Sequence, residues 1–184
     1  MEGGNKSRGR NVYDPLTTSQ KERTISVKNN VNESFCAEGM SKNQKKYKVG
    51  YTTGVFDLFH IGHLNIIKKA KECCEHLIVG VSTDELVMQY KKKKPVIPFE
   101  ERVAIVAAIK YVDEVVVQEI QDKVLAWHKY KYDCVCVGND WQGSEMMIKV
   151  ERELGPKGVD VVIFPRTENT SSTMLTEALI KISS

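Results

Sequence analysis

From Lys48 onward, short apolar runs alternate along the chain with segments whose apolar residues recur every three or four positions. The apolar runs are rich in valine and isoleucine without polar alternation, which is typical of strands buried on both faces of a parallel sheet. The segments between them have the spacing of amphipathic helices. The predicted strands are 49–53, 77–82, 114–118, 134–138 and 159–165, and the predicted helices lie near 62–74, 99–110, 121–131, 144–154 and 172–182.

This alternation predicts an α/β fold, a Rossmann-like three-layer sandwich with a five-stranded, mainly parallel sheet. In such a domain, ligands bind at the carboxyl ends of the strands. Glycine-rich and polar motifs of this chain follow several predicted strands, so we expect them to meet at one edge of the sheet.

The first part of the chain has a different composition. Residues 1–48 carry 10 Lys/Arg against 5 Asp/Glu, whereas the remainder carries 17 against 19. This segment is polar and poor in large apolar residues, so it cannot bury enough surface to offset its ordering entropy. We therefore expect a disordered basic N-terminal extension over 1–46 and a folded domain over 47–184. Charge alone is weak support for a nucleic-acid partner, which we do not expect.

The overall composition, with 41% hydrophobic and 28% charged residues among 184, is that of an ordinary globular protein. No apolar run approaches the roughly 20 residues that span a membrane, and the N-terminus shows no apolar signal segment. Five cysteines, an odd number, suit a reducing compartment, so we expect a cytoplasmic protein without a membrane span. Cys73 and Cys74, predicted on a helix, and Cys134 and Cys136, predicted on a strand, lack the spacing of zinc ligands, so we expect no protein-held metal.

The stretch 51–63, Y-T-T-G-V-F-D-L-F-H-I-G-H, contains the most informative chemistry. It predicts a strand, a turn at Gly54, and a helix that opens with His60 and His63 on one face. The unpaired N–H groups of a helix start attract phosphate, and imidazole donors there can stabilise charge that develops on a polyphosphate. Gly62 lacks a side chain between the histidines, so an anion could approach the backbone closely.

Gly54-Val55-Phe56-Asp57 followed by His60-x-Gly62-His63 resembles the signature of the HxGH nucleotidyltransferases, and within them the cytidylyltransferases. The resemblance covers about 48–182 and is closest to the glycerol-3-phosphate branch. It implies the nucleotidyltransferase fold and catalytic roles for His60 and His63. It also implies nucleotide contacts from the first motif, with Asp57 reaching the acceptor as well: Thr53, Gly54, Phe56, Asp57 and Gly62.

The loop 91–94, four consecutive lysines, has the place of the catalytic lysine loop in this family. The loop is about one residue longer than in the glycerol-3-phosphate branch, so the choice among the four stays open, with Lys92 and Lys94 favoured. Arg102, in Pro98-Phe99-Glu100-Glu101-Arg102, resembles the arginine of the family's E-R element, which implies a nucleotide contact. In the family an arginine is common where this chain has Lys110.

Two further motifs resemble family elements. Residues 138–143, G-N-D-W-Q-G, resemble G-D-D-W-x-G, which implies that Gly138 and Asp140 contact the nucleotide and that Trp141 lines the acceptor pocket. Residues 166–173, R-T-E-N-T-S-S-T, resemble R-T-E-G-I-S-T-T, the segment that binds nucleotide phosphates. The second resemblance implies a catalytic role for Arg166 and nucleotide contacts from Thr167, Ser171 and Ser172.

The resemblance implies transfer of CMP from CTP to an alcohol phosphate, with glycerol 3-phosphate the leading acceptor and Mg²⁺ accompanying the triphosphate. It also implies a homodimer with the segment near 110–116 close to the interface. Phosphocholine and phosphoethanolamine stay open as acceptors. An adenylyltransferase that uses ATP is the main alternative, because spacing does not expose the contacts that choose the base. A nucleotide-binding module without turnover is the non-enzymatic alternative.

Overall fold

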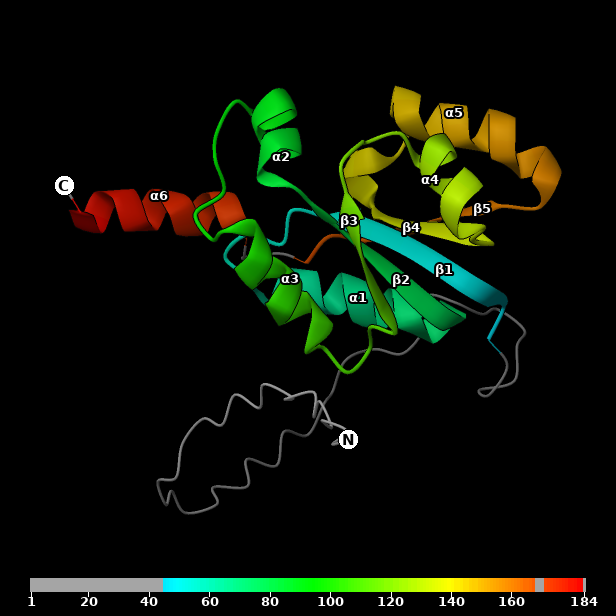
Figure 1. Ribbon diagram of the computed structural model, residues 1–184, viewed down its shortest axis with the longest axis horizontal. Coiled ribbons are helices and arrows are strands. Elements are labelled where there is room, and N and C mark those ends of the chain that lie inside the picture. The colour runs from blue at the N-terminus through cyan, green and yellow to red at the C-terminus, as the bar shows by residue number, and fades with distance from the viewer. Residues whose placement is uncertain (1–44, 168–170, 184) are drawn as a thin grey trace, which may run out of the picture. The chain divides into compact units, whose positions relative to one another are not determined.

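The computed structural model of the protein describes residues 45–167 and 171–183. Their central element is a five-stranded sheet with the strand order β3-β2-β1-β4-β5 (Figure 1). The strands are β1 Tyr47–Gly54, β2 Cys74–Ser82, β3 Glu114–Gln118, β4 Cys134–Gly138 and β5 Asp160–Phe164. The helices are α1 Ile61–Cys73, α2 Asp84–Lys91, α3 Phe99–Ala107, α4 Lys123–Tyr130, α5 Glu145–Leu154 and α6 Ser172–Ser183, with short 3₁₀ helices η1 Asn139–Trp141 and η2 Gly155–Lys157.

All the pairings between neighbouring strands are parallel. The chain builds β1, β2 and β3 outward in one direction, then returns to the other side of β1 for β4 and β5. The strand order therefore reverses between β1 and β4, and a doubly wound sheet leaves its ligand crevice at the carboxyl ends of those strands. The predicted α/β fold is confirmed.

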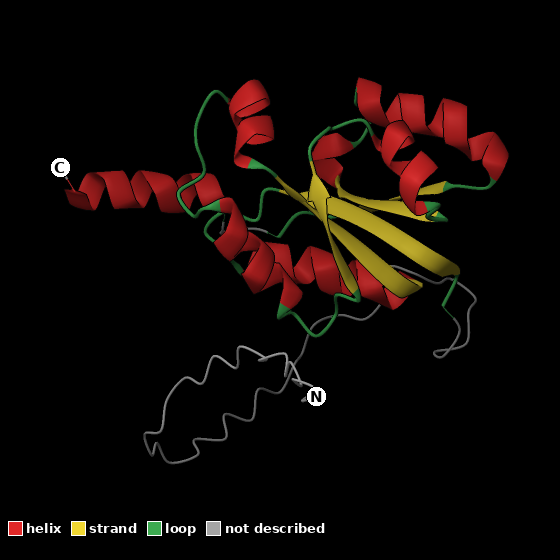
Figure 2. Cartoon of the chain, in the orientation of Figure 1, coloured by secondary structure: helices red, strands yellow, loops and turns green. Residues whose placement is uncertain are grey.

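Helices cover both faces of the sheet (Figure 2). One core lies between the sheet and helices α1 and α3, with Ile67, Leu77 and Val106 fully buried. The other lies between the sheet and helices α4 and α5, with Tyr132 and Leu154 fully buried. Each strand of the middle of the sheet thus packs apolar side chains on both sides, which is why its sequence shows no polar alternation.

Side-chain caps mark where several helices begin. The hydroxyl of Thr83 accepts a hydrogen bond from Leu86 N at 3.1 Å and starts α2, and the carboxylate of Asp122 accepts one from Val124 N at 2.8 Å and starts α4. Such caps satisfy N–H groups that a helix start leaves unpaired. Helix α2 was absent from the predicted helices, and the S-T-D-E sequence at 82–85 contains the capping residue of its start.

Two local predictions were wrong. Cys74 is the first residue of β2 instead of the last turn of the preceding helix, because α1 ends at Cys73 and the strand begins three residues before the apolar run at 77. The turn after β1 also relies on other residues than Gly54. Phe56 and Leu58 have the positive φ values there, 55° and 45°. An added Cβ at Gly54 would lie 3.0 Å from the Phe56 ring, so this glycine provides room for that ring.

Other sequence predictions are only partly addressed by the structure. Apart from Lys45 and Lys46, the predicted extension 1–46 lies outside the described residues, so its disorder stays a prediction. In the part of the chain that the structure describes, no helix combines the length and the apolar character that crossing a bilayer requires.

Candidate active site

A pocket with a volume of about 370 Å³ opens at the carboxyl ends of β1 and β4, where the strand order reverses. It is lined by residues from both halves of the sheet, from the start of α1, and from the segment between β5 and α6. The predicted site residues that line it are Thr53, Gly54, Phe56, His60, Gly62, His63, Gly138, Asp140, Trp141, Arg166, Thr167, Ser171 and Ser172. The predicted site residues outside this lining are Asp57, Lys92, Lys94 and Arg102.

His60 is the N-cap of α1, and its Nδ1 accepts a hydrogen bond from Gly62 N at 3.0 Å. An imidazole that accepts at Nδ1 has its proton on Nε2, so the Nε2–H remains available as a donor. Burial, and secondarily the charge of Arg166, lower the pKa of His60 below its usual value. His60 is therefore mainly neutral at pH 7.

His63 lies one turn further along α1, and its ring stacks on that of His60 with centroids 3.9 Å apart. Its edge also meets the Phe56 ring at 5.3 Å. Burial above all, and then the neighbouring His60 and Lys91, lower the pKa of His63 to about 3. Its Nδ1 is buried without a hydrogen-bond partner among the described residues. A polar atom in that state is costly, so the site favours a ligand that supplies a partner.

The segment after β5 closes the pocket beside the histidines. Thr167 accepts a hydrogen bond from the Asn65 side chain at 3.0 Å, which ties this segment to α1. The Ser172 hydroxyl donates to the Asp57 carbonyl at 2.8 Å, and the Ser171 hydroxyl accepts from Met174 N at 3.2 Å as a helix cap. Both serines therefore have structural contacts as well as a place in the pocket. Residues 168–170 of this motif lie outside the described residues.

Lys123, which the sequence analysis did not single out, also lines the pocket. It is only 4% exposed, and its Nζ donates to Thr53 Oγ1 at 2.9 Å. The same ammonium lies 5.4 Å from the centre of the Trp141 ring, within cation–π range. Burial lowers the pKa of Lys123 to about 8, against a smaller opposing effect of Asp122. A buried ammonium with so few partners is well suited to bind an anion.

The lysine loop contributes Lys91 to the pocket lining. Helix α2 continues through Lys91, and Lys92 takes the left-handed C-cap position with φ 56°. Neither Lys92 nor Lys94, the favoured catalytic lysines, is in the lining. The structure thus brings a lysine of the predicted group to the site, one position before the favoured pair.

Other polar pocket residues absent from the predictions include Asn65, Lys69 and Tyr90. Lys123 follows the same rule as the predicted motifs, since it begins the helix after a strand, and that rule could have found it. Asn65 and Lys69 give no sequence signal, because in the sequence a pocket residue of this kind cannot be told from an ordinary polar residue on an exposed helix face.

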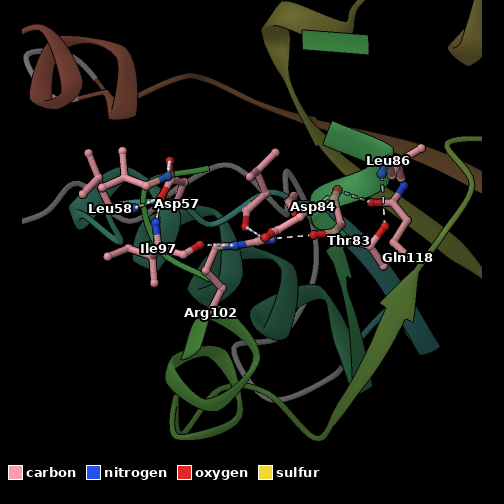
Figure 3. Close-up of polar contacts among 12 residues, drawn as sticks. Asp57, Leu58, Thr83, Asp84, Leu86, Ile97, Arg102 and Gln118 are labelled. Carbon is pink, nitrogen blue, oxygen red and sulfur yellow. Dashed lines mark hydrogen bonds and ion pairs between the residues drawn. The ribbon is translucent and has the colours of Figure 1, made fainter. Parts of the chain in front are cut away.

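Arg102 and Asp57 lie behind the pocket, where they bind the protein's own backbone. Arg102 is fully buried, and burial of this guanidinium is matched by hydrogen bonds to three segments of the chain (Figure 3). Neither side chain is among the residues that line the pocket. Their predicted nucleotide contacts stay predictions.

Known proteins resemble this chain over most of the described domain. The glycerol-3-phosphate cytidylyltransferase of Bacillus subtilis (strain 168) is 35% identical over 135 residues, which are 70% of this chain and 94% of that protein. The FAD synthase of Pyrococcus abyssi is 39% identical over 114 residues, 61% of this chain and 76% of that protein. The crystal structure of the lipopolysaccharide core biosynthesis protein from Thermoplasma volcanium GSS1 superposes with a TM-score of 0.56 at 24% identity, over 67% of this chain and 99% of that one, and supports the fold.

The family model described as "Cytidylyltransferase-like" matches residues 51–184. The match begins in β1, just before the histidine motif, and includes every residue that lines the pocket. Sequence, fold and the relatives above agree with it. The chain therefore belongs to the cytidylyltransferase-like family and is an enzyme of the nucleotidyltransferase class.

Proposed function

We propose that the protein transfers CMP from CTP to an alcohol phosphate, with glycerol 3-phosphate the leading acceptor, and releases pyrophosphate. The observation that carries this proposal is the stacked, neutral histidine pair at the start of α1, inside a pocket with Arg166, Lys91 and Lys123 in its walls. Relatives named glycerol-3-phosphate cytidylyltransferase, at 35% and 33% identity, support the acceptor.

The reaction forms a bond from an acceptor phosphate oxygen to the α-phosphorus of CTP and breaks the bond from that phosphorus to the bridging oxygen of pyrophosphate. A phosphate monoester has its second pKa near 6, so the nucleophile is largely deprotonated at pH 7. The site thus has no need of a general base, which suits histidines whose pKa values are lowered. Catalysis would come from positioning and from electrostatic stabilisation of the leaving group.

His60 is suited to the leaving pyrophosphate because its Nε2–H is free to donate while its Nδ1 is held by Gly62 N. Arg166 has the fork of donors that matches phosphate oxygens. Lys123 is a second cation in the pocket, beside Trp141 and Thr53, and it supports an acceptor with a phosphate of its own.

Mg²⁺ is part of the proposal as the companion of the triphosphate. The described residues contain no group of three or more His, Cys, Asp or Glu side chains that could hold a metal ion. Asp140 contributes a carboxylate to the pocket lining. Mg²⁺ commonly keeps several waters and binds through one or two carboxylates plus substrate phosphates, so one carboxylate fits this ion. Bound there, the ion would neutralise phosphate charge.

A homodimer is proposed on the family resemblance, with the segment near 110–116 at its interface. Strand β3 is an edge of the sheet, and Val117 on it is 49% exposed, which supports a contact on that side. Analytical ultracentrifugation would give the mass, and a monomer at micromolar concentration would count against it. A cytoplasmic location is likewise proposed, because the odd number of cysteines suits a reducing compartment.

The first experiment measures pyrophosphate release with Mg²⁺, crossing CTP and ATP against glycerol 3-phosphate, phosphocholine and phosphoethanolamine, with chelator as the control. Release with CTP and glycerol 3-phosphate alone is expected. The alternative, adenylyl transfer from ATP, rests on the FAD synthase relatives, so ATP with flavin mononucleotide is added to the set. Release only with ATP would overturn the choice of CTP, and silence in all combinations would overturn the proposed reaction.

A further inference from the structure

The carboxylate of Asp57 is occupied by backbone N–H groups from two segments (Figure 3). Its Oδ1 accepts from Leu58 N at 3.0 Å and from Ile97 N at 2.9 Å, and its Oδ2 accepts from Val96 N at 2.9 Å. Charged acceptors bind N–H groups about twice as strongly as neutral ones. Asp57 thus joins the turn before the histidines to the end of the loop that follows α2.

Arg102 holds the same loop from its other side. Its Nε donates to Ile97 O at 3.0 Å, and its Nη1 donates to Val55 O at 2.5 Å and to Ser82 O at 2.8 Å. Its Nη2 pairs with the Asp84 carboxylate at 2.6 Å. The rigid fork of a guanidinium suits such simultaneous contacts, which a lysine cannot reproduce.

Both backbone groups of Ile97 are therefore bound, its N–H by Asp57 and its carbonyl by Arg102. The other end of the loop is fixed by α2, whose C-cap Lys92 donates its backbone N–H to Met88 O at 3.2 Å. Lys93 and Lys94 lie between these anchors, and Lys91, the last residue of α2 just before the C-cap, lines the pocket that also contains His63.

We infer that Asp57 and Arg102 are positioning residues that anchor the lysine loop and thereby hold Lys91 at the triphosphate side of the pocket. The role of Lys91 in turnover rests on the proposed function, whereas the anchoring itself does not. Removal of either anchor leaves backbone groups unpaired, several of them partly buried, so the loop would open to regain hydrogen bonds with water.

Trypsin tests the anchoring directly, because it cleaves after Lys91, Lys92 and Lys93, while Pro95 protects the bond after Lys94. Asp57→Asn keeps the side-chain volume but removes the charge and an acceptor oxygen. We expect cleavage of the folded variant within 91–93 to be roughly tenfold faster than in the wild type, since cleavage follows the open population. Mass spectrometry of early fragments identifies the site of the cut.

Asp133→Asn is the matched control. The Asp133 carboxylate also accepts two backbone N–H bonds, from Lys48 N at 3.1 Å and Val49 N at 2.8 Å, but it lies at the amino end of the sheet. A general loss of stability would accelerate cleavage equally in both variants, and that result would overturn the inference. Arg102→Lys is a second variant and should resemble Asp57→Asn if it folds, as judged by circular dichroism.

A double-mutant cycle links the anchor to turnover. If Asp57 acts through Lys91, then Asp57→Asn combined with Lys91→Met should lower kcat/KM for CTP no further than Lys91→Met does alone. Losses that multiply would contradict a positioning role. Trypsin cleavage does not depend on turnover, so a wild type without pyrophosphate release would overturn the proposed function and leave the cleavage comparison to decide the anchoring.

Discussion

At the amino end of α1, two imidazoles stack in contact, and the environment of each opposes a positive charge. A neutral imidazole still offers one N–H donor, and in a desolvated pocket such a donor is worth more than in water. The pair is therefore better suited to stabilise charge on a leaving phosphate than to transfer a proton.

His63→Ala should raise the barrier of the transfer by roughly 3–4 kcal/mol, which is the cost of losing one preorganised donor to a developing anion. We expect kcat to fall about 10²- to 10³-fold, with a smaller change in KM for CTP. Steady-state pyrophosphate release measures both quantities. His128→Ala, an exposed histidine on α4 outside the pocket lining, is the control and should keep wild-type turnover. Equal turnover in the two variants would contradict the assigned role of His63.

The site residues that could be predicted are those that belong to contiguous sequence motifs. His60, His63 and Arg166 belong to contiguous motifs, and the structure brings all three to one pocket. The choice among the lysines of 91–94 depends on where α2 ends, and a helix end is poorly determined by sequence. For Arg102, the motif indicated a site residue. Only the structure shows that three of its hydrogen bonds go to backbone carbonyls.

At the scale of elements, β1 is the strand on which the others depend, because it pairs with both β2 and β4. Gly50, in its middle, lies between cysteines of the two neighbours. An added Cβ would lie 2.6 Å from Cys74 Sγ and 3.5 Å from Cys134 Sγ. The close approach of these side chains to the backbone of β1 requires glycine at this position.

Gly50→Ala should therefore lower the free energy of unfolding by about 1–3 kcal/mol, the usual cost of an overpacked core. Urea titration followed by circular dichroism measures the change. In Gly155→Ala, the new Cβ would meet no described heavy atom within 4 Å, so this control should be neutral or slightly stabilising. Adding Cys74→Ala should recover part of the loss in Gly50→Ala, since it removes the clashing sulfur. A Gly50 variant as stable as the Gly155 variant would refute the packing argument.

The five strands were all predicted, each within one residue at its carboxyl end, because valine-rich runs bounded by polar motifs are a strong signal. The start of β2 was placed too late, since Cys74, Glu75 and His76 do not resemble a buried strand. Helix α2 is eight residues long and has only a short apolar pattern, so its cap was the main signal.

At the scale of the whole molecule, Lys123 makes stability depend on pH. Burial lowers its pKa in the folded state to about 8 from the ordinary 10.5. Below about pH 8 both states hold the proton, and the folded state has the full cost of a buried charge. Between about pH 8 and 10.5 the unfolded state binds more protons than the folded state, so this contribution makes stability rise with pH.

Lys123→Met removes this dependence. We expect the gain in unfolding free energy of the variant over the wild type to be larger at pH 7 than at pH 10, by on the order of 2–3 kcal/mol. Other lysines and the tyrosines titrate in both proteins, so their effects cancel in the difference. Urea unfolding at several pH values measures it, and parallel stability curves for the two proteins would show that Lys123 has an ordinary pKa.

The sequence by itself determined the fold class, the order of the strands along the chain, and the histidine motif at the carboxyl end of the first strand. Those features depend on local periodicity and on short contiguous motifs, which the chain order preserves. Only the tertiary structure decided which charged side chains share the pocket and which form hydrogen bonds with the backbone instead. Lys123 and Arg102 are both cations near strand ends, but burial beside an open pocket leaves one available to an anion, whereas burial among carbonyl groups commits the other to holding the loop.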